Sequence, residues 1–499
     1  MLSMNDHKVV IIGGGPAGLT AAHELGKARV PCVVLEKDLV LGGLARTVCH
    51  NGYLFDIGGH RFFTKVKAVE QMWVDVLGDD FVRCRRLSRI YYNKRFFHYP
   101  LRLLDTLLGL GLWNSTLILG SYLQAQLFPC ATEDTFEHWI CNRFGTRLYR
   151  MVFKTYTEKV WGIPCSQIKA EWAAQRIKGL SLFEAVKHAL LKPAGGRKGQ
   201  AIKTLIDAFD YPKMGPGMMW NAVARLVEKE GNTVRLGAGV EQINWSGNRV
   251  SSVQVSANGR SELIEGTHFL SSMPIQELIR KLDPPVPAAV LQAASGLSYR
   301  DFITVALILN KGDVFPDNWI YIHDPSVRVG RIQNFKNWSP HMVPDVRKTC
   351  LGLEYFCSVG DDLWQMADAA LIELAKQEVE SLGLIRSSDV EDGTVVRMPK
   401  AYPVYDTGFR EKLHTIREFL DPLENLQVIG RNGMHKYNNQ DHSMLTAMLA
   451  VKNILGAQYD LWQVNEEQHY HEDGATGTGA LAKEFQNLAT TQPSVPERL

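Results

Sequence analysis

The sequence lacks the cysteine patterns of a disulfide framework or a metal site. Its 499 residues include eight cysteines, and none of them forms a CxxC pair or stands at metal-ligand spacing from a histidine. Scattered thiols in a chain of this length are typical of a reducing compartment. The first apolar run begins at Val9, which leaves almost no room for a signal peptide before it. We therefore expect a cytoplasmic protein without a bound metal.

The chain also lacks a charge excess and a long apolar segment. Its 55 basic and 53 acidic residues give a net charge of +2, so no global attraction to nucleic acid is expected. The most apolar stretch, residues 101–128, is interrupted by Arg102, Asp105, Asn114 and Gln124. It has no unbroken apolar run long enough to span a membrane. We expect buried or groove-lining helices there, with contact at a membrane surface as the second interpretation.

A dinucleotide-binding pattern opens the chain. Residues 9–12 form a short apolar run of the kind a buried parallel strand needs. They are followed by Gly13, Gly15 and Gly18 in the spacing GxGxxG, and Glu36 ends the next apolar run. The glycines allow a tight turn, approach of a pyrophosphate and close helix–strand packing, while the acid can accept ribose hydroxyls. The helix N-terminus adds N–H donors for the phosphates.

Two further glycine turns favour FAD over NAD. Residues 41–46 (LGGLAR) resemble the extended flavin motif of the amine oxidase and mutase flavoproteins, in which Gly43 and Arg46 would follow the pyrophosphate and ribityl chain. A surface turn is the alternative interpretation of Arg46. In residues 55–63, Gly59 and its preceding glycine would let the backbone approach a flat ring, and His60 follows directly.

Four sequence blocks together resemble the UDP-galactopyranose mutases, and most closely the longer eukaryotic-type members. The run from Tyr437 to Ser443 is the most specific, because aromatic, amide, acid and histidine side chains converge at a helix N-terminus. The blocks are residues 9–60; 135–145, 156–164 and 172–176; 215–220; and 401–404, 430–433 and 437–443.

The resemblance implies a role for each site residue. His60 would lie near flavin N5, Arg331 and Arg431 would clamp a substrate diphosphate through their planar donor forks, and Tyr402 and Tyr437 would hydrogen-bond the same group. Structural ion pairs and core packing are the alternatives for the arginines and tyrosines. Trp319, Tyr321 and Arg176 would surround the nucleotide and sugar, while Val240, Gly430, Asn439 and Gln440 would contact the cofactor.

The implied function is that of an FAD-dependent nucleotide-sugar mutase, which interconverts pyranose and furanose forms of a UDP- or dTDP-sugar through an adduct at N5 of reduced FAD. NADPH or NADH is the candidate reductant. The spacing from Tyr437 to Asn439 is about two residues shorter than in the eukaryotic mutases, so the sugar is left open. A second interpretation is an FAD-dependent oxidoreductase of the amine oxidase or desaturase type, acting on a sugar, an amine or a lipid-linked substrate.

A third interpretation is a binding protein without catalysis, since escort proteins for prenylated GTPases share this architecture. The intact glycines and Glu36 count against it. The expected fold is α/β, with a Rossmann-type FAD-binding domain, a helical insert and an antiparallel substrate domain. The oligomeric state is left open. The expected segments are 1–98, 205–275 and 420–460 for the FAD domain, 99–204 for the helical domain, 276–419 for the substrate domain and 461–499 for the tail.

Overall fold

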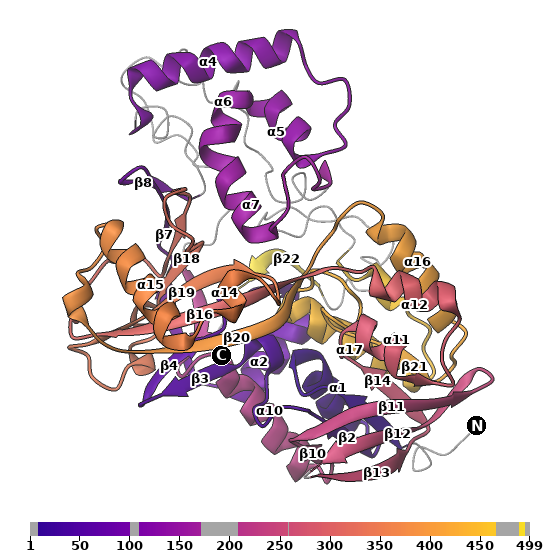
Figure 1. The fold of residues 1–499 in the computed structure, drawn as a ribbon. Helices are drawn as coiled ribbons and strands as arrows, with labels where there is room; N and C mark the ends of the chain where they lie inside the picture. The colour runs from indigo at the N-terminus through magenta and orange to yellow at the C-terminus, as the bar shows by residue number, and fades with distance from the viewer. Residues whose placement is uncertain (1–7, 100–108, 171–207, 258, 466–488, 495–499) are drawn as a thin grey trace.

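The computed structural model describes residues 8–99, 109–170, 208–257, 259–465 and 489–494 (Figure 1). It has an α/β region, a large mixed sheet and a helical lobe whose lower end contacts the large sheet. The α/β fold with a Rossmann-type domain predicted from the sequence is confirmed. Arg176 and much of the helical domain expected at residues 99–204 lie outside the described residues.

A five-stranded parallel sheet forms the centre of the α/β region, in the order β10-β2-β1-β14-β21. All four residues of β1 are buried, as parallel strands covered by other elements require. Helix α1 packs against α17 and α10, which come from distant parts of the chain. The bounds are β1 Val9–Ile12, α1 Pro16–Lys27, β2 Cys32–Leu35, α10 Gly217–Lys229, β10 Thr233–Arg235, β14 His268–Ser271, β21 Leu426–Val428 and α17 Gln440–Ile454.

Shorter elements complete this region. A four-stranded sheet has the order β13-β12-β11-β15, and two two-stranded ladders pair β3 with β4 and β6 with β9. Their bounds are η2 Gly43–Ala45, β3 Thr47–His50, β4 Tyr53–Asp56, α2 Lys67–Leu77, β6 Phe81–Arg85, β9 Ala208–Pro212, β11 Ala238–Ser246, β12 Arg249–Ala257, β13 Arg260–Glu265, α11 Ile275–Lys281, β15 Leu282–Asp283, α12 Ala288–Ser295, α16 Phe409–Leu420 and η6 Leu461–Gln463.

The second large sheet has seven strands in the order β20-β16-β19-β18-β17-β7-β8. Its pairs are antiparallel except β17 with β7, where a strand from the N-terminal part of the chain joins. The bounds are β7 Ser88–Tyr92, β8 Arg95–His98, β16 Tyr299–Leu309, β17 Trp319–Ile322, β18 Arg331–Asn334, α13 Phe335–Trp338, η4 Pro340–Met342, β19 Thr349–Cys357, α14 Asp362–Gln365, α15 Asp368–Ser381, η5 Ser387–Asp389 and β20 Val390–Pro403.

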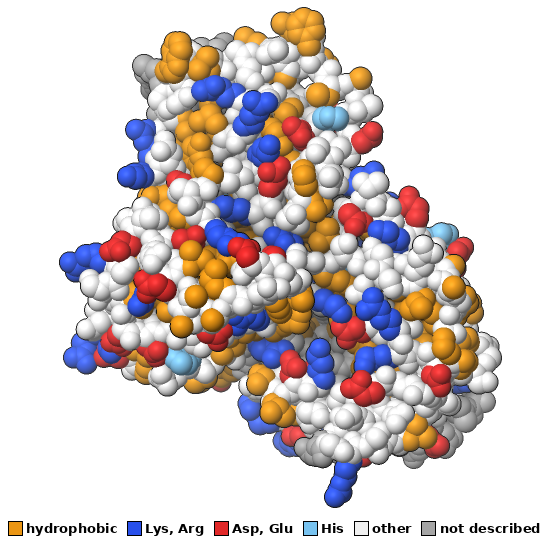
Figure 2. All heavy atoms as spheres, in the orientation of Figure 1, with side chains coloured by type: hydrophobic (Ala, Val, Ile, Leu, Met, Phe, Trp, Pro, Cys, Tyr) orange, Lys and Arg blue, Asp and Glu red, His pale blue; other side chains and the backbone are white. Residues whose placement is uncertain are grey.

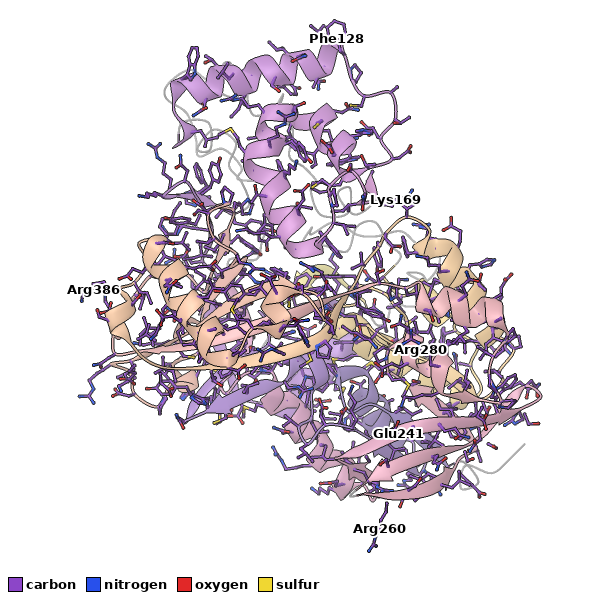
Figure 3. The ribbon with its side chains drawn as sticks, in the orientation of Figure 1. Phe128, Lys169, Glu241, Arg260, Arg280 and Arg386 are labelled. Atoms are coloured by element: carbon purple, nitrogen blue, oxygen red, sulfur yellow. The ribbon has the colours of Figure 1, made fainter. Side chains whose placement is uncertain are left out.

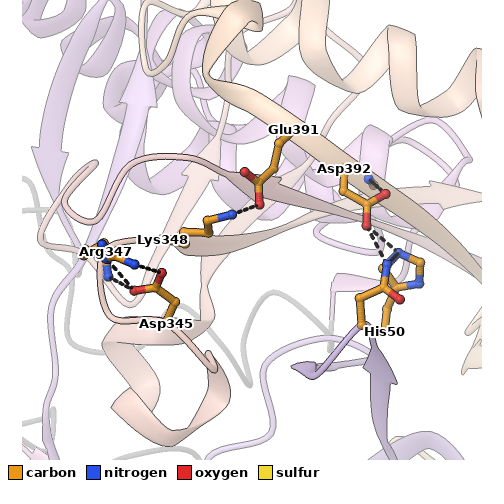
Figure 4. A network of polar contacts seen from close by, with 8 residues as sticks. His50, Asp345, Arg347, Lys348, Glu391 and Asp392 are labelled. Carbon is orange, nitrogen blue, oxygen red and sulfur yellow. Dashed lines mark hydrogen bonds and ion pairs between the residues drawn. The ribbon is translucent and has the colours of Figure 1, made fainter.

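Ion pairs on the surface of this sheet tie β20 to two other segments (Figure 4). Lys348 Nζ lies 2.5 Å from a Glu391 carboxylate oxygen, and His50 Nε2 lies 2.9 Å from an Asp392 oxygen. Figure 2 shows basic and acidic side chains interspersed over the face that it draws, which fits the near-balance of charge in the sequence.

The helical lobe has its own apolar core, which includes Ile118, Phe136, Ile140 and Phe144. Its helix α5 begins at a cap, because Thr135 Oγ1 accepts a hydrogen bond from the His138 N–H. Among the described residues, no helix is long and apolar enough to cross a membrane. The bounds are α4 Leu112–Leu127, α5 Phe136–Phe144, α6 Thr146–Leu148, η3 Tyr149–Lys154 and α7 Thr155–Trp161.

A strand near the C-terminus, β22 (Ala489–Ser494), pairs antiparallel with β5 (Thr64–Val66). Strand β5 begins four positions after His60 in the sequence. Part of the segment expected as a tail therefore lies beside the strand that follows the His60 loop.

Candidate active site

The glycine turn after β1 has a shape that only glycine allows at two positions. Gly13 has φ +106°, and a Cβ there would lie 2.2 Å from Ser272 Oγ. A Cβ on Gly18 would lie 1.9 Å from the Gly13 carbonyl oxygen. Gly15 differs, since its nearest neighbour is Gly43 Cα at 3.8 Å. Gly15 therefore keeps one side of the turn open, where a pyrophosphate can approach the backbone.

The N-terminus of α1 and Glu36 complete this turn. Gly15 is the N-cap and provides no side-chain cap, so the first N–H groups of the helix are available to phosphate. The buried Glu36 carboxylate accepts hydrogen bonds from the backbone N–H of Gly14 at 2.6 Å and of Asp38 at 2.9 Å. Each oxygen keeps a further lone pair for a ribose hydroxyl. These residues fit the ADP half of FAD.

Arg46 bonds to its own turn. Its Nε donates to the Gly43 carbonyl at 2.8 Å, and its guanidinium also pairs with Asp38 at 2.5 Å. The arginine therefore ties the second glycine turn to Asp38, which follows β2, and any contact with the cofactor would be made from this position.

The loop that carries His60 is anchored by a buried carboxyl group. Asp56, the last residue of β4, accepts hydrogen bonds from the Tyr211 hydroxyl and from Thr47 Oγ1. Burial raises the pKa of Asp56 to about 7, and the two hydrogen bonds act in the opposite direction. Gly58 follows with φ +91°; a Cβ there would lie 3.8 Å from His60 Cε1 and 3.7 Å from an Arg331 terminal nitrogen. The loop thus brings His60 to Arg331.

Arg331 occupies the first position of β18 and faces Glu354 of β19 across the ladder. Its Nε donates a hydrogen bond to Glu354, whose other oxygen accepts from Gln333 Nε2 at 2.8 Å. Glu354 is fully buried. The tyrosines Tyr156 and Tyr402 lie close enough for electrostatic interaction with Arg331.

Arg431 reaches the same place from the loop after β21. Its Nε donates to the Asn438 carbonyl at 2.8 Å and its Nη1 to the Ala401 carbonyl at 3.1 Å. The guanidinium lies 4.7 Å from the Tyr437 ring centroid and 5.6 Å from that of Tyr402. The two rings stack with centroids 5.7 Å apart. Unlike Arg331, Arg431 directs these hydrogen bonds to carbonyls.

Burial and the two arginines together keep His60 uncharged. Burial is the main cause, and the positive charges of Arg431 and Arg331 add to it, lowering the pKa of His60 to about 3. The imidazole is therefore neutral at neutral pH and can donate one hydrogen bond and accept another.

Aromatic rings and two more arginines flank this group. Arg86 lies 5.4 Å from the Trp319 ring centroid and 5.7 Å from that of Tyr99, and Tyr99 contacts Tyr321 at 4.7 Å. Arg61, next to His60, interacts with Arg86 and Tyr321. Together these side chains add positive charge and flat apolar surfaces to the region around Arg331.

The structure thus brings together seven of the residues predicted from the sequence: His60, Arg331, Arg431, Trp319, Tyr321, Tyr402 and Tyr437. At the cofactor end, Gly430 has φ +81° and its N–H donates to Thr446 Oγ1 at 3.0 Å. The N–H of Asn439 donates to His442 Nδ1 at 3.2 Å, and Gln440 begins α17. Val240 is buried in β11. Gly59 lies near the side chains of Gln333 and Trp338.

Sequence reasoning missed Glu354, Tyr156, Tyr99, Arg61 and Arg86 as site residues. Glu354 is recognisable only from the register of β18 and β19. Arg61 could have been recognised from the sequence, because it directly follows His60. Among the described residues, no group of histidine, cysteine and carboxylate side chains could hold a metal ion.

Solved structures share this fold. A crystal structure of reduced UDP-galactopyranose mutase superposes with a TM-score of 0.79 at 20% identity, covering 93% of this chain and 97% of that one. A candidate protoporphyrinogen oxidase from Exiguobacterium sp. 255-15 gives a TM-score of 0.67 at 18% identity, with coverage of 91% and 99%. At these identities the likeness establishes the fold alone.

Some curated proteins match this chain over short segments. A 1H-pyrrole-2-carbonyl-[peptidyl-carrier protein] chlorinase from Pseudomonas fluorescens is 60% identical over 38 residues, which are 8% of this chain and 8% of the chlorinase. The chain therefore spans a small part of that relative's length.

Family models cover much more of the chain. A model described as an NAD(P)-binding Rossmann-like domain matches residues 11–76, and one described as flavin containing amine oxidoreductase matches residues 152–430. The second match includes more than half of the 499 residues. It supports FAD as the cofactor, in agreement with the glycine turn and Glu36. The chain belongs to the flavin containing amine oxidoreductase family.

Proposed function

We propose that this protein is an FAD-dependent mutase that interconverts ring forms of a UDP- or dTDP-sugar. The observation that carries the proposal is the convergence of Arg331 and Arg431 on a neutral His60, beside the stacked rings of Tyr402 and Tyr437. Two guanidinium groups and two phenol groups in one place match the oxygens of a diphosphate.

The charge of the site supports an anionic substrate. Arg331, Arg431, Arg61 and Arg86 contribute four positive charges, and the buried Glu354 carboxylate is bonded to Arg331. A protonated amine would be repelled here, because like charges at close range in a partly buried site cost several kcal/mol. The site therefore disfavours the amine substrates that the family description suggests.

The residues have separate tasks in this proposal. Arg431, Tyr402 and Tyr437 would hold the departing diphosphate close to the sugar, so that it can be recaptured. Neutral His60 would accept or donate a hydrogen bond beside the flavin ring without adding a further positive charge. Trp319 and Tyr321 would offer flat surfaces to the nucleobase. Reduced FAD, when bound, would supply the nucleophile for the anomeric carbon.

Anaerobic conversion tests this function directly. The purified flavoprotein is reduced with dithionite and incubated with a panel of UDP- and dTDP-pyranoses, and the products are separated by chromatography. We expect an isomer only from the reduced protein. If no nucleotide sugar gives an isomer and none perturbs the flavin spectrum, the mutase proposal fails.

The second candidate is an FAD-dependent oxidoreductase acting on an anionic or lipid-linked substrate. It is favoured by the family description and by the fold shared with the candidate protoporphyrinogen oxidase. Net oxidation of a substrate by the oxidised flavin, without added reductant, would identify it. The mutase proposal includes a reducing, cytoplasmic setting, with NADPH or NADH as the electron donor. The eight free cysteines of the structure agree with such a setting.

A further inference from the structure

Helix α4 presents an apolar face that the rest of the described chain does not cover. Trp113, Leu123 and Leu127 are 76%, 60% and 73% exposed, and Phe128, directly after the helix, is 78% exposed. The helix forms the outer edge of the helical lobe (Figure 1), and Figure 2 shows hydrophobic side chains gathered there. Phe128 lies at its far end (Figure 3). Apolar patches of this kind mark interaction sites.

The inner face of α4 is fixed on the lobe. Ile118 is fully buried, Ser121 Oγ accepts from the Arg147 N–H at 3.1 Å, and Asn114 Oδ1 accepts from Arg147 Nη2 at 2.9 Å. Gly145 packs so closely on the helix that a Cβ there would lie 2.7 Å from the Tyr122 nitrogen. The orientation of α4 is therefore set by packing, and its apolar face points outward as part of the folded structure.

Gly120 lies in the middle of that outer face, and no contact among the described residues requires a glycine there. A Cβ at Gly120 would meet nothing within 4 Å, and its φ is not positive. A glycine inside a helix costs about 0.5–1 kcal/mol relative to alanine. Close approach of another backbone, from outside this chain, would account for it.

The exposed residues repeat at coiled-coil spacing. Trp113, Gly120 and Leu127 stand seven positions apart, and Thr116 and Leu123 follow the same interval. A seven-residue repeat keeps side chains on one stripe of a helix and is the spacing that packs two helices together. In an antiparallel pair centred on Gly120, Trp113 of each helix would meet Leu127 of the other, with the small residues at the crossing point.

We propose that α4 is a self-association surface that pairs with α4 of a second copy of this chain about a two-fold axis. The stripe is self-complementary under that symmetry, as a two-fold interface requires. No charged residue occurs between Asp105 and Glu133, so the pairing brings no like charges together. A helix lying on a lipid surface carries Lys and Arg on its polar face, and α4 has neither.

Sedimentation equilibrium of the full-length flavoprotein tests the pairing. We expect a dimer at micromolar concentration. Gly120→Leu meets no clash among the described residues and improves helix propensity, so the variant keeps or raises its Tm while its dimer dissociation constant rises at least about 10-fold. Leu123→Glu has the same effect on association. Leu263→Glu on β13 is the matched control, because Leu263 is also 60% exposed, and it leaves the dimer unchanged.

A wild-type chain that stays monomeric overturns the proposal, as does a dimer that both Gly120→Leu and Leu123→Glu leave intact. Flotation with vesicles of phosphatidylcholine and phosphatidylglycerol tests the lipid alternative. Vesicle binding by a monomeric wild-type chain, lost in Leu123→Glu and kept in Leu263→Glu, would assign the face to a membrane and contradict self-association.

Discussion

The two ends of the candidate flavin site are built in different ways. At the phosphate end, the backbone of Gly13 to Gly18 and the nearby Glu36 carboxylate would provide the contacts to the cofactor, all within one β-α-β unit. At the proposed substrate end, Arg331 and Arg431 converge on His60, and tyrosines from other segments surround the two arginines. The first end depends on the absence of side chains, and the second depends on their charge.

This difference predicts how each end responds to mutation. Adding a methyl group at the phosphate end changes shape, and so affects cofactor binding or folding. Removing a charge at the substrate end changes electrostatics, and its cost depends on what the charge was paired with. Arg331 and Arg431 make that comparison within one site, because only Arg331 bonds to a buried carboxylate in the structure.

The largest effect is expected at Arg331. Arg331→Ala leaves Glu354 buried without its ion pair, which should lower the free energy of unfolding by about 3–5 kcal/mol. Adding Glu354→Gln should restore much of this stability without restoring UDP binding. Arg431→Ala should lower the free energy of unfolding by less than about 1.5 kcal/mol and should also weaken UDP binding. Thermal unfolding of the four proteins measures this, and equal losses for the two arginines would remove the distinction.

Substitutions at Gly18 and Gly15 should distinguish an effect on folding from an effect on cofactor binding. Gly18→Ala forces a Cβ against the Gly13 carbonyl, so we expect a loss of about 3 kcal/mol and little bound flavin. Gly15→Ala has room in the apoprotein and should keep its apo Tm but lose FAD affinity. Flavin content and the Tm of the apoproteins are the measurements; a Gly18→Ala protein with full flavin would contradict the packing argument.

His60→Ala should reduce turnover about 100-fold and leave the flavin in place. The imidazole is expected to act on the reaction beside the ring, whereas the phosphate end holds the cofactor. Single-turnover rates and the flavin absorbance of the purified variant check this. Loss of the flavin would instead make His60 a structural residue.

The pH dependence of stability in Asp56→Asn tests the role of Asp56 as the anchor of the His60 loop. The pKa of Asp56 is raised to about 7 in the folded state, above its ordinary value of 3.8. Its stabilising contribution is therefore complete below pH 4 and is lost as pH rises toward 7. Asn does not titrate, so the stability of the wild type relative to Asp56→Asn should fall between pH 4 and 7, by at most about 1.4 kcal/mol per pH unit. A constant difference would show that Asp56 is ionised throughout.

The smallest effect is expected at the surface pair of Lys348 and Glu391 (Figure 4). Lys348→Met removes an exposed charge whose partner stays hydrated, and such pairs contribute little. The Tm and the UDP affinity should match the wild type within error. A clear loss of either would mean that the contrast between buried and exposed pairs does not hold here.

The phosphate end could be predicted from the sequence because its residues are neighbours in the chain. The spacing of Gly13, Gly15 and Gly18 and the position of Glu36 are sufficient for it. The residues of the substrate end were predicted from the resemblance to a family. The side chains that hold them in place could not be predicted in this way. The pairing of Arg331 with Glu354 depends on strand register, and the approach of Arg86 to Trp319 depends on β7 joining the seven-stranded sheet.

Titration with UDP tests the central claim that the arginine group binds a diphosphate. The flavin absorbance of the oxidised and the reduced holoprotein is followed as UDP is added to the wild type, Arg431→Ala and Arg431→Lys. We predict saturable binding by the wild type, at least about 10-fold weaker binding by Arg431→Ala, and incomplete rescue by lysine. Equal affinity in all three proteins, or no binding to the wild type in either redox state, would contradict the account.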